Sequence, residues 1–314
     1  MPQTINTNIV SLNAQRNLNG SQSALAVAMQ RLSSGLRVNS AKDDAAGLAI
    51  AERMNSQVRG MNVAIRNAND GISLAQTAEG ALGKLGDMLQ RMRELAVQSR
   101  NSTNSDGDRT NLQREFTQLQ EEMDRVIKSS NFNSKALFDG TAGTLEFQVG
   151  ANAAATDRIS IASIDLLGSS ITAASAIDTT GTLAADADVL ATVVGIWDGS
   201  AGTGVAIGGV SSAGTAVAGS TEIDNAINVI DRALGIVNDK RAIFGAVQNR
   251  FEAVIGNLQT AAENQTAARS RIMDADFAAE TAMLSRAQIL QQAGNAMVAQ
   301  ANQLPQQVLQ LLGR

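Results

Sequence analysis

Residues 283–311 constrain the fold of this chain more than any other stretch. Large apolar residues recur there every seven positions, and mostly small residues follow four positions after the first four of them (Met283, Leu290, Met297, Leu304 and Leu311; Ala287, Gly294, Ala301 and Val308). This heptad seam predicts a helix that packs along another helix. From Met283 onward the only charged residues are Arg286 and Arg314, whereas a helix with a free outer face usually carries many charges. Either the helix is buried against its own domain, or it packs on the N-terminal end and on other copies of the chain.

The N-terminal end has the same two properties. Apolar residues recur at helical spacing from Ile5 to Leu36, and Arg16 is the only charged residue before Arg31. Because charge depletion also marks the core of an interface, we expect the two ends to pair in one coiled-coil domain that contacts other copies. The residues expected to carry this self-assembly are Ile5, Ile9, Leu12, Leu25, Met29, Leu32, Leu290, Met297, Leu304, Val308 and Leu311.

The composition excludes several classes of function. The 314 residues include no His and no Cys, which removes His-based catalysis, disulfides and the metal sites built from imidazole or thiolate. The net charge of −5 argues against a nucleic-acid partner, and no apolar run is long enough to insert in a membrane. We therefore expect no enzyme, no cofactor and no metal, although carboxylate or Lys chemistry stays open.

The first residues do not form an ordinary secretory signal, because no basic region is followed by an apolar core. Two interpretations stay open at this point. The protein is cytoplasmic, or it is exported by a machine that recognises another feature.

Between the two ends, the pattern predicts a mainly α fold. Helical spacing indicates helices at about 44–98, 108–129 and 221–268, and alternating apolar residues indicate a β-hairpin with strands near 144–149 and 157–162. Ser40 or Asp43 is expected to cap the helix at 44–98, which would be about 80 Å long at 1.5 Å per residue. The expected molecule is therefore an elongated rod of long coiled-coil helices.

The segment between Arg158 and Arg232 contains no Lys or Arg and is rich in Gly, Ala, Ser and Thr. Its short apolar pieces indicate a small β-rich insert rather than a disordered linker. The resulting layout is nested and has three domains. Residues 1–43 and 269–314 form the terminal domain, residues 44–165 and 221–268 form a helical bundle with the hairpin, and residues 166–220 form a small variable domain on the surface.

Several long motifs resemble one known family. They lie near both ends of the chain and occur in the family's order: residues 5–8 (INTN), 12–15 (LNAQ), 31–47 (RLSSGLRVNSAKDDAAG), 89–98 (LQRMRELAVQ) and 300–309 (QANQLPQQVL). All of them resemble bacterial flagellin. The resemblance covers roughly 1–165 and 221–314, and residues 165–221 carry no signal of the family.

The resemblance implies a subunit that assembles with itself into the helical filament of the bacterial flagellum, outside the cell. It implies that the terminal helices line the central channel, that the long helices and the hairpin form the wall, and that the insert faces the medium. It also implies export through the flagellar type III apparatus, a flagellar export chaperone that binds the C-terminal helix, and a filament cap.

A further resemblance, to flagellins sensed by an animal Toll-like receptor, implies a recognition surface. The matching residues are Gln90, Arg91, Glu94, Leu95, Gln98 and Glu115. Helical spacing places Arg91, Leu95 and Gln98 on one face, and the same face is a candidate for packing against the next subunit.

Two other functions are compatible with parts of the sequence. A hook–filament junction protein shares the terminal helices, but the continuous motifs at 31–47 and 89–98 favour the filament subunit. A carboxylate-based hydrolase in the insert would need paired acids in a pocket, and the only close pair there is Asp186 and Asp188.

Overall fold

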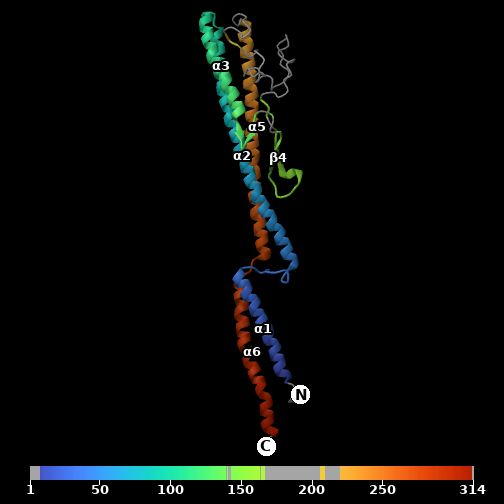
Figure 1. Ribbon diagram of the computed structural model, residues 1–314. Helices are drawn as coiled ribbons and strands as arrows, with labels where there is room; N and C mark the ends of the chain where they lie inside the picture. Colours follow the sequence, from blue (N-terminus) through green and yellow to red (C-terminus); the bar gives the residue numbers. More distant parts are fainter. Residues whose placement is uncertain are drawn as a thin grey trace. The chain divides into compact units, whose positions relative to one another are not determined.

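The computed structural model describes residues 8–138, 140, 143–162, 164–166, 206–208 and 220–312 (Figure 1). The chain divides into two compact units. Unit 1 comprises residues 1–59 and 261–314, and unit 2 comprises residues 60–260. Each unit is therefore built from segments that are far apart in the sequence.

Five α-helices account for most of the described residues: α1 (Ile9–Ser34), α2 (Ala45–Arg100), α3 (Asp106–Ser129), α5 (Ser220–Met273) and α6 (Phe277–Leu312). They confirm the prediction of a mainly α fold. With 56 and 54 residues, α2 and α5 are each about 80 Å long at 1.5 Å per residue. Gly71 does not interrupt α2, and α6 continues through Pro305. The predicted rod shape of the whole molecule depends on how the two units are joined, so it stays a prediction.

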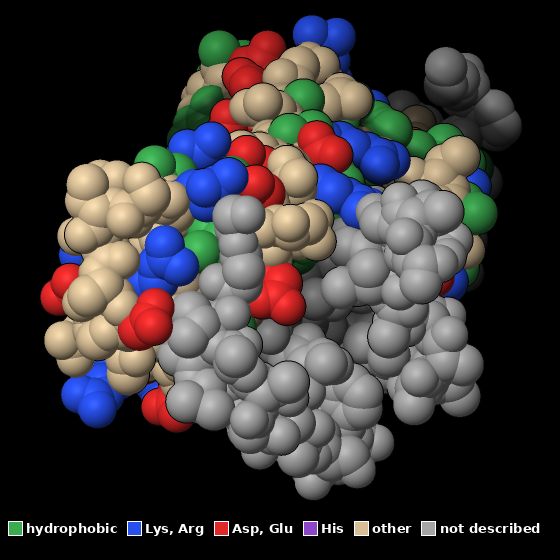
Figure 2. Space-filling model, turned by 90° about the horizontal axis from the view of Figure 1, so that it is seen from above, with side chains coloured by type: hydrophobic (Ala, Val, Ile, Leu, Met, Phe, Trp, Pro, Cys, Tyr) green, Lys and Arg blue, Asp and Glu red, His purple; other side chains and the backbone are tan. Residues whose placement is uncertain are grey.

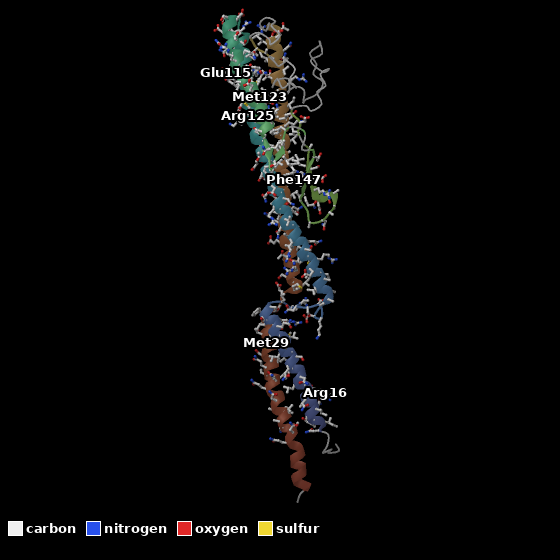
Figure 3. All side chains as sticks on the ribbon, in the orientation of Figure 1. Arg16, Met29, Glu115, Met123, Arg125 and Phe147 are labelled. Carbon is white, nitrogen blue, oxygen red and sulfur yellow. The ribbon has the colours of Figure 1, made fainter. Side chains whose placement is uncertain are left out.

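Unit 2 has a closed apolar core between α2, α3 and α5. Leu82, Leu89 and Phe116 are fully buried there. Gly71 of α2 leaves room for Phe251 of α5, since a Cβ at position 71 would lie 2.6 Å from the ring. The Phe251 ring meets Phe147 edge-on, with centroids 5.5 Å apart (Phe147 is labelled in Figure 3).

The predicted β-hairpin is confirmed. Strand β3 (Leu145–Gln148) pairs antiparallel with β4 (Arg158–Ile161), and Phe147 lies opposite Ile159. Ile159 and Ile161 are buried in the core of unit 2, while Arg158 and Ser160, which alternate with them, are exposed. Two strands alone are marginally stable, so the contact with the helices stabilises this pair.

A second, shorter hairpin was not predicted from the sequence. Strand β1 (Asn131–Phe132) pairs with β2 (Lys135–Ala136) around Asn133 and Ser134. Both turn residues have positive φ, 48° and 64°, as a two-residue hairpin turn requires. Asn enters this backbone region more readily than most residues, and it was the one signal available in the sequence.

In unit 1, α1 and α6 pair along their lengths, which confirms that both ends of the chain form one helical domain (Figure 1). The order of contacts makes the pair antiparallel, because Asn8 meets Ala301 and Arg31 meets Glu280. The connectors beyond the two helices are joined by an isolated bridge between Leu36 and Asp274.

The connector between α1 and α2 corrects the expected cap. Asp44, not Ser40 or Asp43, precedes α2, and its Oδ1 accepts a hydrogen bond from the Gly47 N–H at 2.7 Å. Asp43 instead closes the preceding turn, since its Oδ2 accepts from the Ser40 hydroxyl and from the N–H groups of Ser40 and Asn39. These hydrogen bonds, first of all the one from the Ser40 side chain, hold the pKa of Asp43 below its ordinary value.

The predicted β-rich insert, residues 166–220, lies outside the described residues except for its first and last residues and for residues 206–208. Ile207 is fully buried in the core of unit 2. Its N–H donates to Oε1 of Gln113 at 2.7 Å, and its carbonyl accepts from the Ser99 hydroxyl. These contacts fix that short piece of the insert to α2 and α3.

Candidate assembly surface of the terminal helices

Polar contacts near the free end of the α1–α6 pair set its register. Asn8 caps α1 by accepting from the Ser11 N–H at 3.1 Å, and its side-chain amide donates to the Ala301 carbonyl of α6 at 2.7 Å. The Ser11 hydroxyl donates to Oδ1 of Asn302 at 2.8 Å. Because a seven-residue apolar seam tolerates slippage, these partly buried polar pairs favour one alignment of the two helices.

The two helices approach each other closely farther along the pair, toward the C-terminal end of α1. Gly294 of α6 faces Leu18 of α1, and a Cβ at position 294 would lie 3.1 Å from the Leu18 Cδ1. Ala287 and Ala301 occupy neighbouring positions of the same seam and are almost fully buried. The small seam positions predicted from the sequence are thus those that α1 covers.

At the other end of the pair, Nη1 of Arg31 donates to Oε1 of Glu280 at 3.1 Å. The Glu280 side chain is 7% exposed and the Arg31 side chain is 27% exposed. A pair this well buried loses more when one partner is removed than it contributes when complete. The ion pair therefore also favours a single alignment of α1 on α6.

The large seam positions Met283, Leu290 and Met297 stay about half exposed in the described part of the chain. Ten of the fourteen exposed large apolar side chains in the described part of the chain lie in these two helices: Ile9, Val10, Leu12, Val27 and Met29 in α1, and Phe277, Met283, Ile289, Leu290 and Met297 in α6. Val27, Met283 and Leu290 also line a groove of about 500 Å³ between the two helices. So many exposed apolar side chains on one pair of helices indicate a contact surface for another molecule.

The structure divides the predicted self-assembly residues into three groups. Ile9, Leu12, Met29, Leu290 and Met297 are between 49% and 64% exposed. Leu25 and Leu32 are half-buried between the helices. Ile5 lies outside the described residues, and the side chains of Leu304, Val308 and Leu311 do as well.

The predicted recognition residues surround an ion-pair network in unit 2. Arg91 of α2 contacts Glu115 of α3 at 2.7 Å and Glu94 at 2.9 Å, and these hydrogen bonds, the one with Glu115 first, raise the pKa of Arg91. Figure 3 labels Glu115 on α3. Gln90 and Gln98 are exposed beside it. At this end of α2, α3 and α5, Lys and Arg side chains alternate with Asp and Glu on the surface (Figure 2).

Leu95 does not share this exposure. Its side chain is fully buried in the core of unit 2, although helical spacing puts it near Arg91 and Gln98. The Arg91 side chain reaches from α2 to Glu115 of α3 at the surface, whereas the Leu95 side chain packs in the apolar core. In the folded unit, Leu95 supports the surface rather than forming part of it.

The described residues contain no group of acidic side chains placed to hold a metal ion. Within the same residues, none of the helices has both the length and the apolar character that a membrane span requires. The residues that sequence reasoning missed are those that fix the helix pair, namely Asn8, Ser11, Glu280 and Asn302.

A helical unit made from both ends of a chain, with its large apolar positions left uncovered, defines a class of protein: a structural subunit that assembles with its own copies. The comparisons with known proteins agree with this class. The family described as "Bacterial flagellin N-terminal helical region" matches residues 5–143, and "Bacterial flagellin C-terminal helical region" matches residues 227–312.

Individual relatives extend the match to the whole chain. A flagellin of Halalkalibacterium halodurans is 44% identical over 308 residues, which cover 98% of this chain and 99% of that protein. The B-type flagellin of Pseudomonas aeruginosa is 35% identical, with 99% and 100% covered. The crystal structure of Bacillus cereus flagellin is 27% identical, covers 65% of this chain and 94% of that one, and has a TM-score of 0.43.

The chain belongs to the bacterial flagellin family. This confirms the resemblance seen in the sequence. The protein is a subunit of the extracellular flagellar filament and polymerises with its own copies. Both relatives are flagellins, which favours the filament subunit over the hook–filament junction protein.

Proposed function

We propose that the exposed apolar positions of α1 and α6 are the surface through which subunits assemble. The observation that carries this proposal is the gathering of exposed large apolar side chains on these two helices. The residues assigned to self-assembly are Ile5, Ile9, Leu12, Leu25, Met29, Leu32, Leu290, Met297, Leu304, Val308 and Leu311. Burying such side chains contributes about 25 cal/mol for each Å² of apolar surface removed from water, which favours polymerisation over the free subunit.

The same proposal assigns the three parts of the chain to places in the filament. Residues 1–43 and 269–314 line the channel, residues 44–165 and 221–268 form the wall, and residues 166–220 face the medium. The exposed Gln300, Asn302 and Gln303 of α6 support the first assignment. A polar, uncharged lining offers a passing unfolded chain neither apolar patches nor ion pairs.

Deletion of residues 283–314 tests the assembly surface. We expect unit 2 to keep its folded core and its unfolding temperature, because that core contains no residue of the deleted segment, and we expect polymerisation to be abolished. Circular dichroism with thermal unfolding measures the first result, and electron microscopy with sedimentation measures the second. Filaments formed by the truncated chain would refute the proposal.

The partners follow from the same assignment. We propose three partners: the flagellar type III export apparatus, a flagellar export chaperone that covers the C-terminal helix before assembly, and a filament cap. The uncovered apolar side chains of α6 support a chaperone, because a free subunit that exposes them is prone to aggregate. We infer no catalytic role, in keeping with the absence of His and Cys from the chain and with a family of structural proteins.

A second proposed role is recognition of the free subunit by an animal Toll-like receptor. The candidates are Gln90, Arg91, Glu94, Gln98 and Glu115, with Leu95 as buried support. The supporting observation is that Arg91 and Glu115, on different helices, form one exposed charged pair.

Substitution Arg91→Ala tests the receptor role. We expect it to reduce receptor signalling by the purified subunit by about tenfold, because the loss of one charged hydrogen bond costs about 1.5 kcal/mol of binding free energy. A reporter-cell assay measures the signal. The control is Arg125→Ala, which removes another exposed Arg that pairs with an acid, Glu122. Equal activation by the wild type and the Arg91 variant would count against the role.

A further inference from the structure

The exposed methionines of the described chain all lie in the assembly surface. Met29 of α1 is 56% exposed, and Met283 and Met297 of α6 are 54% and 56% exposed. The methionines of the other elements differ. Met61, Met92, Met123 and Met273 are buried, and Met54 and Met88 are half-buried. Figure 3 labels one of each kind, Met29 on α1 and Met123 on α3.

A methionine thioether differs from the Leu and Ile side chains around it in one chemical respect: it can be oxidised. The sulfur attacks one oxygen of a peroxide, an S–O bond forms and the O–O bond breaks. The hydroxide that leaves takes the proton from the new S–OH group, so the products are methionine sulfoxide and water. The sulfur loses two electrons and the peroxide gains them. The reaction requires access to the sulfur, so exposure decides which methionines react.

We propose that Met29, Met283 and Met297 form a peroxide-sensitive modification site, and that their oxidation prevents the free subunit from entering the filament. This inference rests on the proposed assembly surface, since it requires these side chains to become buried between copies. Sulfoxide is polar and strongly hydrogen-bonding, and an interface made of apolar side chains leaves its oxygen without a donor.

The groove that Met283 lines has a mixed character. Val27 and Leu290 cannot donate a hydrogen bond there, whereas Ser21, Ser23, Arg31 and Arg286 can. Met297 lies one heptad beyond Leu290 on the same helix face. Unoxidised methionine suits such a surface, because its flexible thioether adapts to the shape of a partner. Oxidation turns the same three positions from adaptable apolar contacts into polar ones.

The site therefore distinguishes the two states of the subunit. In the free subunit the three sulfur atoms are open to peroxide. In the filament, under the proposed function, neighbouring copies cover them and they are protected. Oxidised free subunits are then unable to polymerise, while subunits already in a filament stay unoxidised.

Partition of partly oxidised wild-type protein tests the proposal without any substitution. Purified free subunit is treated with hydrogen peroxide until about half of the molecules carry a sulfoxide, then polymerised and sedimented. Peptide mass spectrometry measures oxidation in the filament and in the supernatant. We expect sulfoxide at positions 29, 283 and 297 to be at least tenfold depleted from the filament, while Met92 and Met123 stay unoxidised in both fractions. Equal oxidation of the two fractions would overturn the inference.

A matched pair of variants provides the second test. The first combines Met29→Leu, Met283→Leu and Met297→Leu, and the control combines Met61→Leu, Met92→Leu and Met123→Leu, which keeps the exposed sulfur atoms. Exchanges between Met and Leu nearly conserve volume and are well tolerated. After peroxide treatment, we expect the critical concentration for polymerisation to rise at least tenfold in the wild type and the control, and less than twofold in the first variant.

The outcomes separate the two proposals. If untreated wild type polymerises and oxidised wild type does so at the same concentration, the modification site is wrong and the assembly surface stands. If the deletion of 283–314 still polymerises, the assembly surface is wrong and the modification site falls with it. If the variant with Leu at positions 29, 283 and 297 does not polymerise before peroxide treatment, the partition experiment on the wild-type protein alone decides whether the modification site is right.

Discussion

The two units of this flagellin differ in how they use apolar side chains. In unit 2, residues such as Leu82, Leu89 and Phe251 are fully buried in a closed core. In unit 1, the buried seam positions are small, whereas large residues such as Leu290 and Met297 are about half exposed. We therefore expect unit 2 to be stable on its own. Under the proposed function, other copies bury the exposed apolar side chains of unit 1.

The sharpest test of this difference replaces one large apolar side chain by Ala in each unit. Phe251→Ala should lower the free energy of unfolding of unit 2 by about 3–5 kcal/mol, because it removes a fully buried ring and leaves a cavity. Leu290→Ala removes a half-exposed side chain, so it should change the stability of the free subunit by about 0.5 kcal/mol or less, yet raise the critical concentration for polymerisation. Chemical denaturation and sedimentation measure the two quantities. An equal loss of stability in both variants would show that unit 1 is as closed as unit 2.

Glycines offer a smaller and more local comparison. At position 71 of α2 an added Cβ meets the Phe251 ring at 2.6 Å, whereas at position 80 of the same helix it meets nothing within 4 Å. We expect Gly71→Ala to destabilise unit 2 by about 1–3 kcal/mol through overpacking, and Gly80→Ala to stabilise it by up to about 1 kcal/mol through helix propensity. Thermal unfolding of the two variants measures the difference, and a gain from both would mean that the Phe251 ring is free to move.

The smallest expected effect concerns the connector of unit 1. The pKa of Asp43 is lower in the folded chain than its ordinary value, so the charged carboxylate stabilises the turn. That stabilisation is complete above the ordinary pKa of about 3.9 and is lost as the pH falls through the lower folded pKa. The N–H groups of Asn39 and Ser40 donate hydrogen bonds to Asp43. Their protection against hydrogen exchange, measured relative to the intrinsic exchange rate at each pH, should therefore be high at neutral pH and fall on acidification.

The variant Asp43→Asn should exchange faster at neutral pH and lose most of the acid dependence. Glu52→Gln, which removes an exposed acid from α2 in the same unit, is the control and should behave as the wild type. Unchanged exchange in Asp43→Asn would mean that the rest of the connector holds the turn without the carboxylate.

The helices and the β3–β4 hairpin could be predicted from the sequence because their signals are local. Apolar spacing and turn residues are properties of a short window, and they placed α3, which runs from Asp106 to Ser129, within two residues of its observed start. The Asn133–Ser134 turn was missed because two-residue strands are too short to show alternation. The cap of α2 was misassigned because Ser40, Asp43 and Asp44 are all acceptable caps, and only the path of the backbone selects Asp44.

The contacts that fix the candidate site could not be predicted in the same way. Asn8 and Ala301 are 293 positions apart, and Arg31 and Glu280 are 249 positions apart. No local pattern connects such residues. The burial of Leu95 was missed for a related reason, since helical spacing gives the direction of a side chain but not how far α3 covers that side of α2.

The double role of Asn8 has a consequence for how the chain folds. The side chain that starts α1 also holds α6, so this contact can form only after nearly the whole chain has been made. Bringing together residues so distant costs loop entropy, and folding unit 2 first shortens the loop that remains to be closed. Once unit 2 has folded, the closure of the two chain ends into the α1–α6 pair can therefore be the last step of folding.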